Sequence, residues 1–178
     1  MTAQRTYTAK QWRHTQYASY FGYITQAIVN NLAPLLFLIF QDVYGIPLEK
    51  ITLLVTVNFC VQLLVDMVAA RFVDKIGYRP CIVAAHLFAA AGLAGLGLLP
   101  RLLPDPFVGL LGAVFLYAIG GGLIEVLISP IVEACPTDNK ASVMSLLHSF
   151  YCWGSVGVIL LSTLFLGVFG KGSWPALA

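Results

Sequence analysis

Charged residues are scarce in this sequence of 178 residues. Lys, Arg, Asp and Glu together make up 10% of the chain, whereas 59% of it is hydrophobic. Soluble domains carry about 25% charged residues, and a domain of this length cannot hide so large an apolar share from water. The scarcity of charge therefore excludes a water-soluble domain. It predicts an all-α protein whose helices span a lipid bilayer.

Catalytic and metal-binding signatures are also missing. The sequence has no His-Glu-x-x-His, no Gly-x-Ser-x-Gly, no Walker-type glycine loop and no Cys/His cluster. The four cysteines, Cys60, Cys81, Cys135 and Cys152, include no Cys-x-x-Cys pair, and we interpret them as free thiols. A net charge of +2 is too small for a nucleic-acid-binding surface. We therefore predict a protein that is not an enzyme and that needs no cofactor, metal or nucleic acid.

What the sequence does contain is a series of long apolar runs. A membrane helix needs about 20 mostly apolar residues, and the runs predict five complete spans at about residues 17–40, 51–73, 80–99, 107–135 and 141–169. Short connections with glycine or proline separate them. Residues 174–178, Trp-Pro-Ala-Leu-Ala, resemble the opening turn of a sixth span. We therefore expect residues 17–178 to be one transmembrane bundle and the chain to be a fragment whose C-terminal half is absent.

The positive charges predict an orientation. One side of the predicted spans carries Arg5, Lys10, Arg13, Arg71, Lys75, Arg79 and Lys140. The other side carries only Lys50, Arg101 and Lys171. Because cytoplasmic loops are enriched in Lys and Arg, the bias predicts a multi-pass protein of the cell membrane with a cytoplasmic N-terminal segment, residues 1–16. Tyr17, Tyr20 and Tyr23 suit anchoring at the membrane surface, although aromatic residues packed between helices would look the same.

Acidic side chains inside the spans are the first functional candidates, because charge is costly there. Glu125 lies near the middle of the fourth span, directly after three glycines, residues 120–122. It could bind and release a proton during a working cycle, or it could be a neutral, hydrogen-bonded structural residue. Asp66 lies about two turns from the cytoplasmic end of the second span, where a coupling role competes with a simple hydrated carboxylate. We interpret Glu133 as an interfacial charge.

Neutral polar side chains form stripes on three of the spans. Gln26 and Asn30 are four residues apart, as are Asn58 and Gln62, so each pair shares one helix face. With Glu125, the predicted substrate-binding residues are Gln26, Asn30, Asn31, Asn58, Gln62, His148, Tyr151 and Trp153. The stripes predict a shared polar cavity. The alternative is that they only join helices through hydrogen bonds worth about 0.6 kcal/mol each.

The second connection, residues 70–79, reads Ala-Arg-Phe-Val-Asp-Lys-Ile-Gly-Tyr-Arg. It resembles the signature between spans two and three of the major facilitator superfamily. Asp74, Lys75, Gly77 and Arg79 match that signature, whereas Ala70 stands where it has a glycine. Gly77 permits a tight turn, and the resemblance implies that the four matching residues form a conformational latch against the other half of a transporter. An ordinary charged inner loop is the alternative.

Two further stretches, residues 120–130 and 148–154, resemble the fourth and fifth spans of the fucose permease branch, which are fucose:proton symporters. The resemblance implies that Glu125 is a proton-binding residue at the substrate site. Three positions depart from the branch. His148 replaces a glutamine, Tyr151 replaces a substrate-contacting asparagine, and Asn31 replaces a membrane aspartate. These departures argue against fucose itself as the solute.

The resemblance also implies an architecture of six-helix halves, each built from two inverted three-helix repeats, with the solute near the midplane. We therefore predict the N-terminal part of a secondary active transporter that couples protons to a sugar or similar small polar solute by alternating access. Sodium coupling and antiport stay open. The alternative from another class is a non-transporting membrane sensor or assembly subunit with a transporter-like fold.

Overall fold

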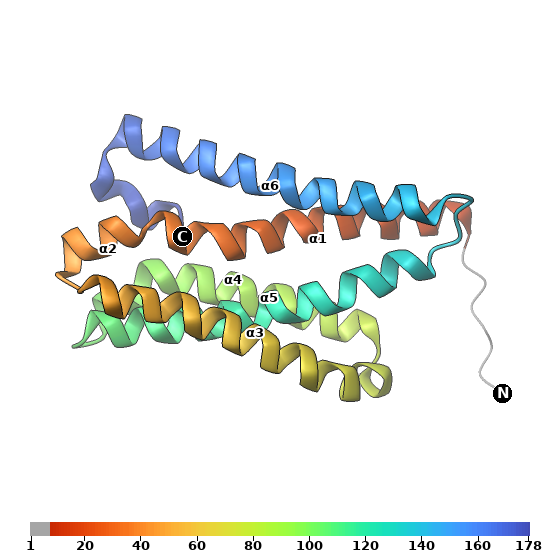
Figure 1. Ribbon diagram of the computed structural model, residues 1–178, viewed down its shortest axis with the longest axis horizontal. Coiled ribbons are helices and arrows are strands. Elements are labelled where there is room, and N and C mark those ends of the chain that lie inside the picture. Colours follow the sequence, from red (N-terminus) through yellow and green to blue (C-terminus); the bar gives the residue numbers. More distant parts are fainter. Residues whose placement is uncertain (1–7) are drawn as a thin grey trace.

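The computed structural model describes residues 8–178, so the first seven residues of the predicted N-terminal segment lie outside the described part. The described chain is helical and contains no strand (Figure 1). Its elements are α1 (Ala9–Leu35), α2 (Phe37–Tyr44), α3 (Leu48–Ile76), α4 (Tyr78–Leu102), α5 (Pro106–Ala134), α6 (Lys140–Phe169) and the short 3₁₀ helix η1 (Lys171–Ala176).

Four helices are long and apolar enough to cross a membrane, namely α3, α4, α5 and α6. A fifth span results if α1 and α2 count as one broken helix, which bends by 41° between them. Pro34 lies two residues before the break at Leu36. Because proline has no N–H, it removes the hydrogen bond to the carbonyl of Asn30 and weakens the helix at this point. The multi-pass membrane character predicted from composition is confirmed.

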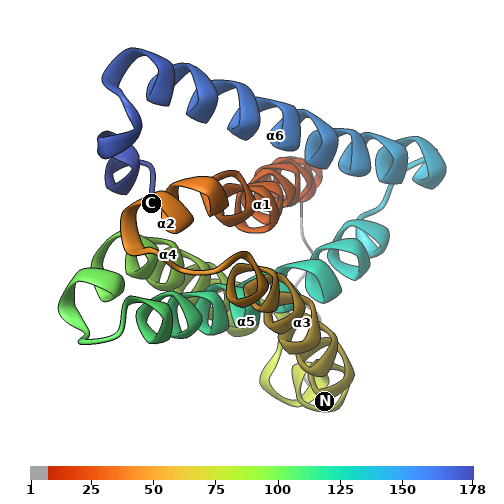
Figure 2. The same ribbon diagram turned by 60° about the vertical axis from the view of Figure 1, so that its left-hand side comes forward.

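The bundle is organised around α5. This helix packs along α4, α3 and α1, whereas α6 packs mainly along α1. Figures 1 and 2 show α6 on the far side of α1 from α3, α4 and α5. Side chains of α5 are apolar nearly throughout, and the five consecutive residues 120–124, which together cover all sides of the helix, are buried. This matches a helix enclosed by neighbours rather than one that covers a single core.

Small residues allow α4 and α5 to approach closely. A Cβ at Gly92 of α4 would overlap the backbone of Tyr117, and one at Gly120 of α5 would overlap the backbone of Ala85 and Ala89. Close approach through small residues is the usual way in which membrane helices gain packing energy, because lipid supplies no hydrophobic drive between them. The α4–α5 pair therefore forms a tightly packed unit against which the other helices are arranged.

Two ends of the bundle are closed by specific contacts. α3 turns into α4 at Gly77, whose φ of 96° is one that L side chains rarely adopt. At the opposite end, η1 returns to the bundle, and the ring of its Trp174 lies 5.2 Å from the ring of Phe40 and 6.2 Å from that of Tyr44. Trp174 is 1% exposed. Trp174, the first residue of the predicted start of a sixth span, is thus packed against α2, whereas Pro175 and Ala178 lie beside Gly97 of α4.

Candidate functional site

A polar cavity of about 280 Å³ lies between α1, α5 and α6. Its lining residues are Tyr23, Gln26, Asn30, Glu125, His148 and Tyr151. α1 supplies three of them at spacings of three and four residues, which places all three on one helix face. The cavity therefore brings the predicted polar residues of the first, fourth and fifth spans to one place.

Glu125 is tied to the cavity wall by an amide. Nε2 of Gln26 donates a hydrogen bond to Oε2 of Glu125 over 3.2 Å. Gln26 is 2% exposed, whereas Glu125 is exposed at the mouth of the cavity. Because one carboxylate oxygen accepts from Gln26, the other is available to a proton or to a donor group of a solute.

The lining has a distinct electrostatic character. Glu125 is its one acidic residue, and no Lys or Arg is among the described residues that line the cavity. A negatively charged solute would meet an uncompensated carboxylate in a medium of low dielectric, which is strongly unfavourable. The arrangement suits a neutral solute rich in hydroxyl groups or, with Glu125 ionised, a cationic one.

Aromatic residues form the wall towards α6. The ring of Tyr23 lies 5.6 Å from the ring of His148 and 6.3 Å from that of Tyr151. The Tyr23 hydroxyl shares a 2.8 Å hydrogen bond with the Ser129 hydroxyl of α5. The sequence left open whether Tyr23 anchors its helix at the membrane surface or packs between helices, and it gave Ser129 no role of its own. The signal that could have placed Tyr23 in the cavity is its spacing of three residues before Gln26.

Other predicted site residues lie outside the lining. Asn58 and Gln62 of α3 are 5% and 4% exposed and bond to each other, and Gln62 also donates to Asn30 from behind the cavity wall. Asn31 directs its amide to the carbonyl of Ala27 and the hydroxyl of Ser155. Trp153 is 75% exposed on the outside of α6.

Asp66 lies beside the cavity rather than in it. It is half-buried on α3, and the charged group that acts on it is Glu125 of α5. Its Oδ1 is one of two buried side-chain polar atoms without a hydrogen-bond partner among residues 8–178, and Oε1 of Gln26 is the other. A buried carboxylate oxygen without a hydrogen-bond donor is costly. Both unpaired atoms belong to residues that interact with Glu125.

The predicted latch residues lie at the turn between α3 and α4. Asp74 and Lys75 end α3, Gly77 forms the turn, and Arg79 begins α4. Asp74, Lys75 and Arg79 are exposed. Within the described chain they form no ion pair with one another or with other residues, since the salt bridge found there joins Lys171 to Asp42. Their charges are therefore available to a partner outside the described chain.

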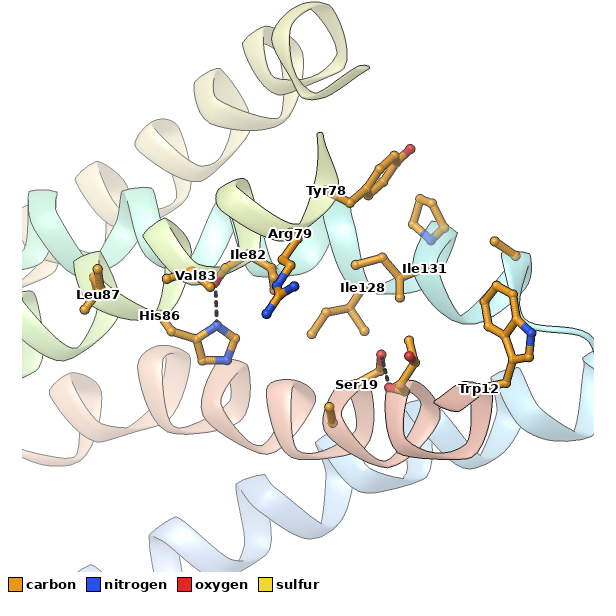
Figure 3. Close-up of a pocket in the computed structure, with 14 residues that line it drawn as sticks. Trp12, Ser19, Tyr78, Arg79, Ile82, Val83, His86, Leu87, Ile128 and Ile131 are labelled. Atoms are coloured by element: carbon orange, nitrogen blue, oxygen red, sulfur yellow. Dashed lines mark hydrogen bonds between the residues drawn. The ribbon is translucent and has the colours of Figure 1, made fainter. Parts of the chain in front are cut away.

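A second, larger hollow of about 1070 Å³ opens between α1 and α4 over one end of α5, and we call it the α1–α4 groove. Figure 3 shows that the side chains of Arg79 and His86 extend from α4 towards α1 within it. Nδ1 of His86 bonds to the carbonyl of Ile82 over 2.8 Å. Apart from these groups the lining is mainly apolar, with Ile82, Val83, Leu87, Ile128 and Ile131. The groove has the character of a helix-packing surface rather than of a polar site.

Comparisons with known proteins give one match. The family model described as Major Facilitator Superfamily matches residues 19–178. No curated protein and no solved structure matches the chain.

Proposed function

We propose that this chain, which belongs to the major facilitator superfamily, forms the solute-binding N-terminal part of a proton-coupled transporter for a sugar or a similar small polar solute. Members of this family are secondary transporters that carry small solutes through a lipid bilayer. The apolar helices α3 to α6 agree with that setting. The identity of the solute and of the coupled ion is the part that we propose.

The observation that carries the proposal is the hydrogen bond between Gln26 and Glu125 in a cavity shared by three helices. An acid at this place can take up a proton, and neutralising it removes a charge that is costly to close off from water inside the bilayer. Alternating access requires such a change between states that face opposite sides of the membrane. Asp66, on which the charge of Glu125 acts, is a second candidate for carrying a proton.

The lining supports a neutral polar solute. Amide, hydroxyl and imidazole groups from Tyr23, Asn30, His148 and Tyr151 surround the carboxyl group of Glu125. Aromatic faces beside hydrogen-bonding groups suit a sugar ring, which has both apolar C–H faces and polar hydroxyl edges. A volume of about 280 Å³ is at the small end of the usual range for ligand sites.

The experiment that tests proton coupling replaces Glu125 with Gln in the complete protein. We expect Glu125→Gln to abolish proton-driven accumulation of solute and to leave exchange of solute across the membrane partly intact. The matched control is Glu133→Gln, which changes an exposed acid eight residues further along the same helix. Undiminished active uptake in Glu125→Gln would contradict the proposed role of this residue in proton coupling.

The proposal includes parts of the protein beyond the described bundle. We propose that a C-terminal half packs against it, with a cytoplasmic N-terminus and with Asp74, Lys75, Gly77 and Arg79 as the latch between the halves. We also propose that a sixth membrane helix fills the α1–α4 groove. The support is the apolar lining of the groove and its course along two membrane helices. Pro175 of η1 also lies against Gly97 of α4, next to the same pair of helices.

A further inference from the structure

A chain of hydrogen bonds leads from α3 through α1 to the wall of the polar cavity. Nε2 of Gln62 donates to Oδ1 of Asn58 over 3.1 Å and to Oδ1 of Asn30 over 2.9 Å. Nδ2 of Asn30 in turn donates to the hydroxyl oxygen of Tyr151 over 3.4 Å. The chain therefore joins three helices that are distant in sequence, and only its last two members line the cavity.

The direction of these bonds fixes which groups face the cavity. Gln62 uses both hydrogens of its amide nitrogen, one for each neighbouring carbonyl oxygen. Because the oxygen of Asn30 is held by Gln62, the NH₂ group of Asn30 must face Tyr151 and the cavity. The hydroxyl oxygen of Tyr151 accepts from Asn30, so its own hydrogen is left for another acceptor.

The packing around Gln62 explains why this arrangement is held. Gln62 is buried, and a Cβ at Gly121 of α5 would lie 3.0 Å from its Nε2. The missing side chain at Gly121 thus gives the amide of Gln62 its place between α3 and α5. Reversing one amide would set two acceptors or two donors against each other in a buried environment, where unpaired polar groups are costly.

We propose that Gln62 and Asn58 are positioning residues that make the Asn30–Tyr151 side of the cavity a hydrogen-bond donor surface. Opposite it, the carboxyl group of Glu125 offers acceptor oxygens, and it keeps acceptor capacity beside its one O–H even when it is protonated. The cavity therefore selects a solute that offers an acceptor oxygen to Asn30 and Tyr151 and a hydroxyl hydrogen to Glu125, as neighbouring hydroxyls of a sugar or polyol do. This inference rests on the proposed function, which it refines by giving the polarity of the site.

The first test replaces Gln62 with Met in the complete protein. Met has a similar length and no donor, so the amide of Asn30 loses its fixed direction. The probe is the monosaccharide or hexitol that raises the melting temperature of the wild-type protein most. We expect its affinity to fall about tenfold, the effect of losing one hydrogen bond of about 1.4 kcal/mol, and KM to rise with little change in kcat. Gln41→Met, at an exposed site on α2, is the matched control and should leave both constants unchanged.

The second test uses Gln62→Glu, because a carboxyl group can donate to Asn30 only when it is protonated. The affinity of this variant, divided by that of the wild-type protein at the same pH, should rise as the pH falls. Glu125 of α5, Asp66 of α3 and His148 of α6 are present in both proteins, so the ratio removes the pH dependence that the two proteins share. Gln62→Met should show no such recovery. A constant ratio for Gln62→Glu contradicts the donor role of residue 62.

A third measurement needs no solute. Ultraviolet resonance Raman bands of tyrosine distinguish a hydroxyl that accepts a hydrogen bond from one that donates. The difference between the spectra of the wild-type protein and of Tyr151→Phe should show the bands of an accepting hydroxyl. The same difference, measured between Gln62→Met and Gln62→Met with Tyr151→Phe, should lack these bands. An unchanged signature would overturn the inference. If no sugar or polyol binds the wild-type protein, the proposed function fails instead, while the Raman result still decides the polarity.

Discussion

Gly120 is one of the residues at which the packing of the bundle tolerates little change. A Cβ there would lie 2.5 Å from the backbone nitrogen of Ala89 and 2.6 Å from the carbonyl oxygen of Ala85. Backbone atoms cannot turn away as a flexible side chain can. We therefore expect Gly120→Ala to lower the free energy of unfolding by about 1–3 kcal/mol, the usual cost of overpacking, as measured by thermal denaturation in detergent.

Gly157 of α6 provides the control for this prediction. Nothing lies within 4 Å of a Cβ built at that position. Alanine is favoured over glycine within a helix by about 1 kcal/mol, so Gly157→Ala should leave the stability unchanged or raise it slightly. Equal losses of stability in Gly120→Ala and Gly157→Ala would show that contact with α4 is not the cause.

Cys135 allows a prediction about pH, because it lies just beyond the end of α5. Burial raises the pKa of its thiol, and the thiol also donates to the carbonyl of Ile131 over 3.3 Å. The thiolate is the reactive form, so a raised pKa means less thiolate at neutral pH. In a protein whose other cysteines are replaced by alanine, we expect Cys135 to react slowly with a maleimide and to gain reactivity only at more alkaline pH. Asp138→Cys in the Cys135→Ala background is the exposed control, and equally fast labelling of both thiols would contradict the expectation.

Single residues also show how much of the candidate site could be predicted from the sequence. The helical period placed Gln26 with Asn30 and Asn58 with Gln62 on common faces. In the structure Gln26 and Asn30 line the same cavity, and a hydrogen bond from Gln62 to Asn30 connects the two pairs. The sequence could not reveal that Asn58 and Gln62 stand behind the cavity rather than in it. That depends on how α3 is rotated against α5, which the small residues of both helices determine together.

At the scale of elements, the α1–α4 groove permits a prediction about the proposed sixth helix. Leu87 of α4 lines the groove and is 65% exposed in the described chain, while Leu161 of α6 is 70% exposed. If a sixth helix fills the groove, Leu87→Cys in the complete protein should be shielded from a maleimide that partitions into lipid. Leu161→Cys should be labelled, unless the C-terminal half covers it. Rapid labelling of Leu87→Cys would show that the groove is open to lipid.

The first predicted span illustrates what element-level reasoning misses. The apolar run indicated one helix at about residues 17–40, whereas the structure has α1 to Leu35 and a separate α2 from Phe37 to Tyr44. Hydropathy does not register the break, because side chains on both sides of it are apolar. Pro34 was the available signal. Proline within a membrane helix is tolerated, however, and its presence alone does not give the size of the bend.

At the scale of the whole molecule, composition was sufficient to predict an all-helical membrane protein, and the signature at residues 70–79 was sufficient to predict the family. Neither could predict how the helices are arranged. α5 is apolar on nearly every side, so no stripe in its sequence states that α4, α3 and α1 are its neighbours. Amphipathic helices carry that information in water, whereas in lipid it lies in the fit between small and large residues.

Linkage between solute and proton is a property of the complete protein. If Glu125 binds the proton that accompanies a neutral solute, a sugar or polyol should stabilise the protein more at the acidic of two pH values, where more Glu125 is protonated. Saturation at a hundredfold excess over Kd adds about 2.7 kcal/mol to stability, which a thermal-shift panel detects readily. Glu125→Gln should bind with little dependence on pH. A larger shift at the alkaline pH would contradict symport.

The complete protein can decide between a transporter and the alternative, a non-transporting sensor or assembly subunit. A second bundle of six or seven membrane helices in the complete protein, with its own Asp-Lys-x-Gly pattern, would favour the transporter. A sensor or assembly subunit would not need it. The same observation also tests the proposal that a C-terminal half meets the charges of Asp74 and Arg79.

The break between α1 and α2 gives the bundle a mechanical property. A helix that lacks the hydrogen bond at Pro34 resists displacement less than an intact one, so it serves as a hinge. The segment beyond the break, α2, is joined to η1. The ring of Trp174 packs against the rings of Phe40 and Tyr44, and Lys171 forms a salt bridge with Asp42. These contacts hold α2 and η1 together beyond the break. Asn30, whose carbonyl lacks the helical N–H partner that Pro34 cannot supply, also lines the polar cavity, so this proline and the cavity lie within about one turn of each other along α1.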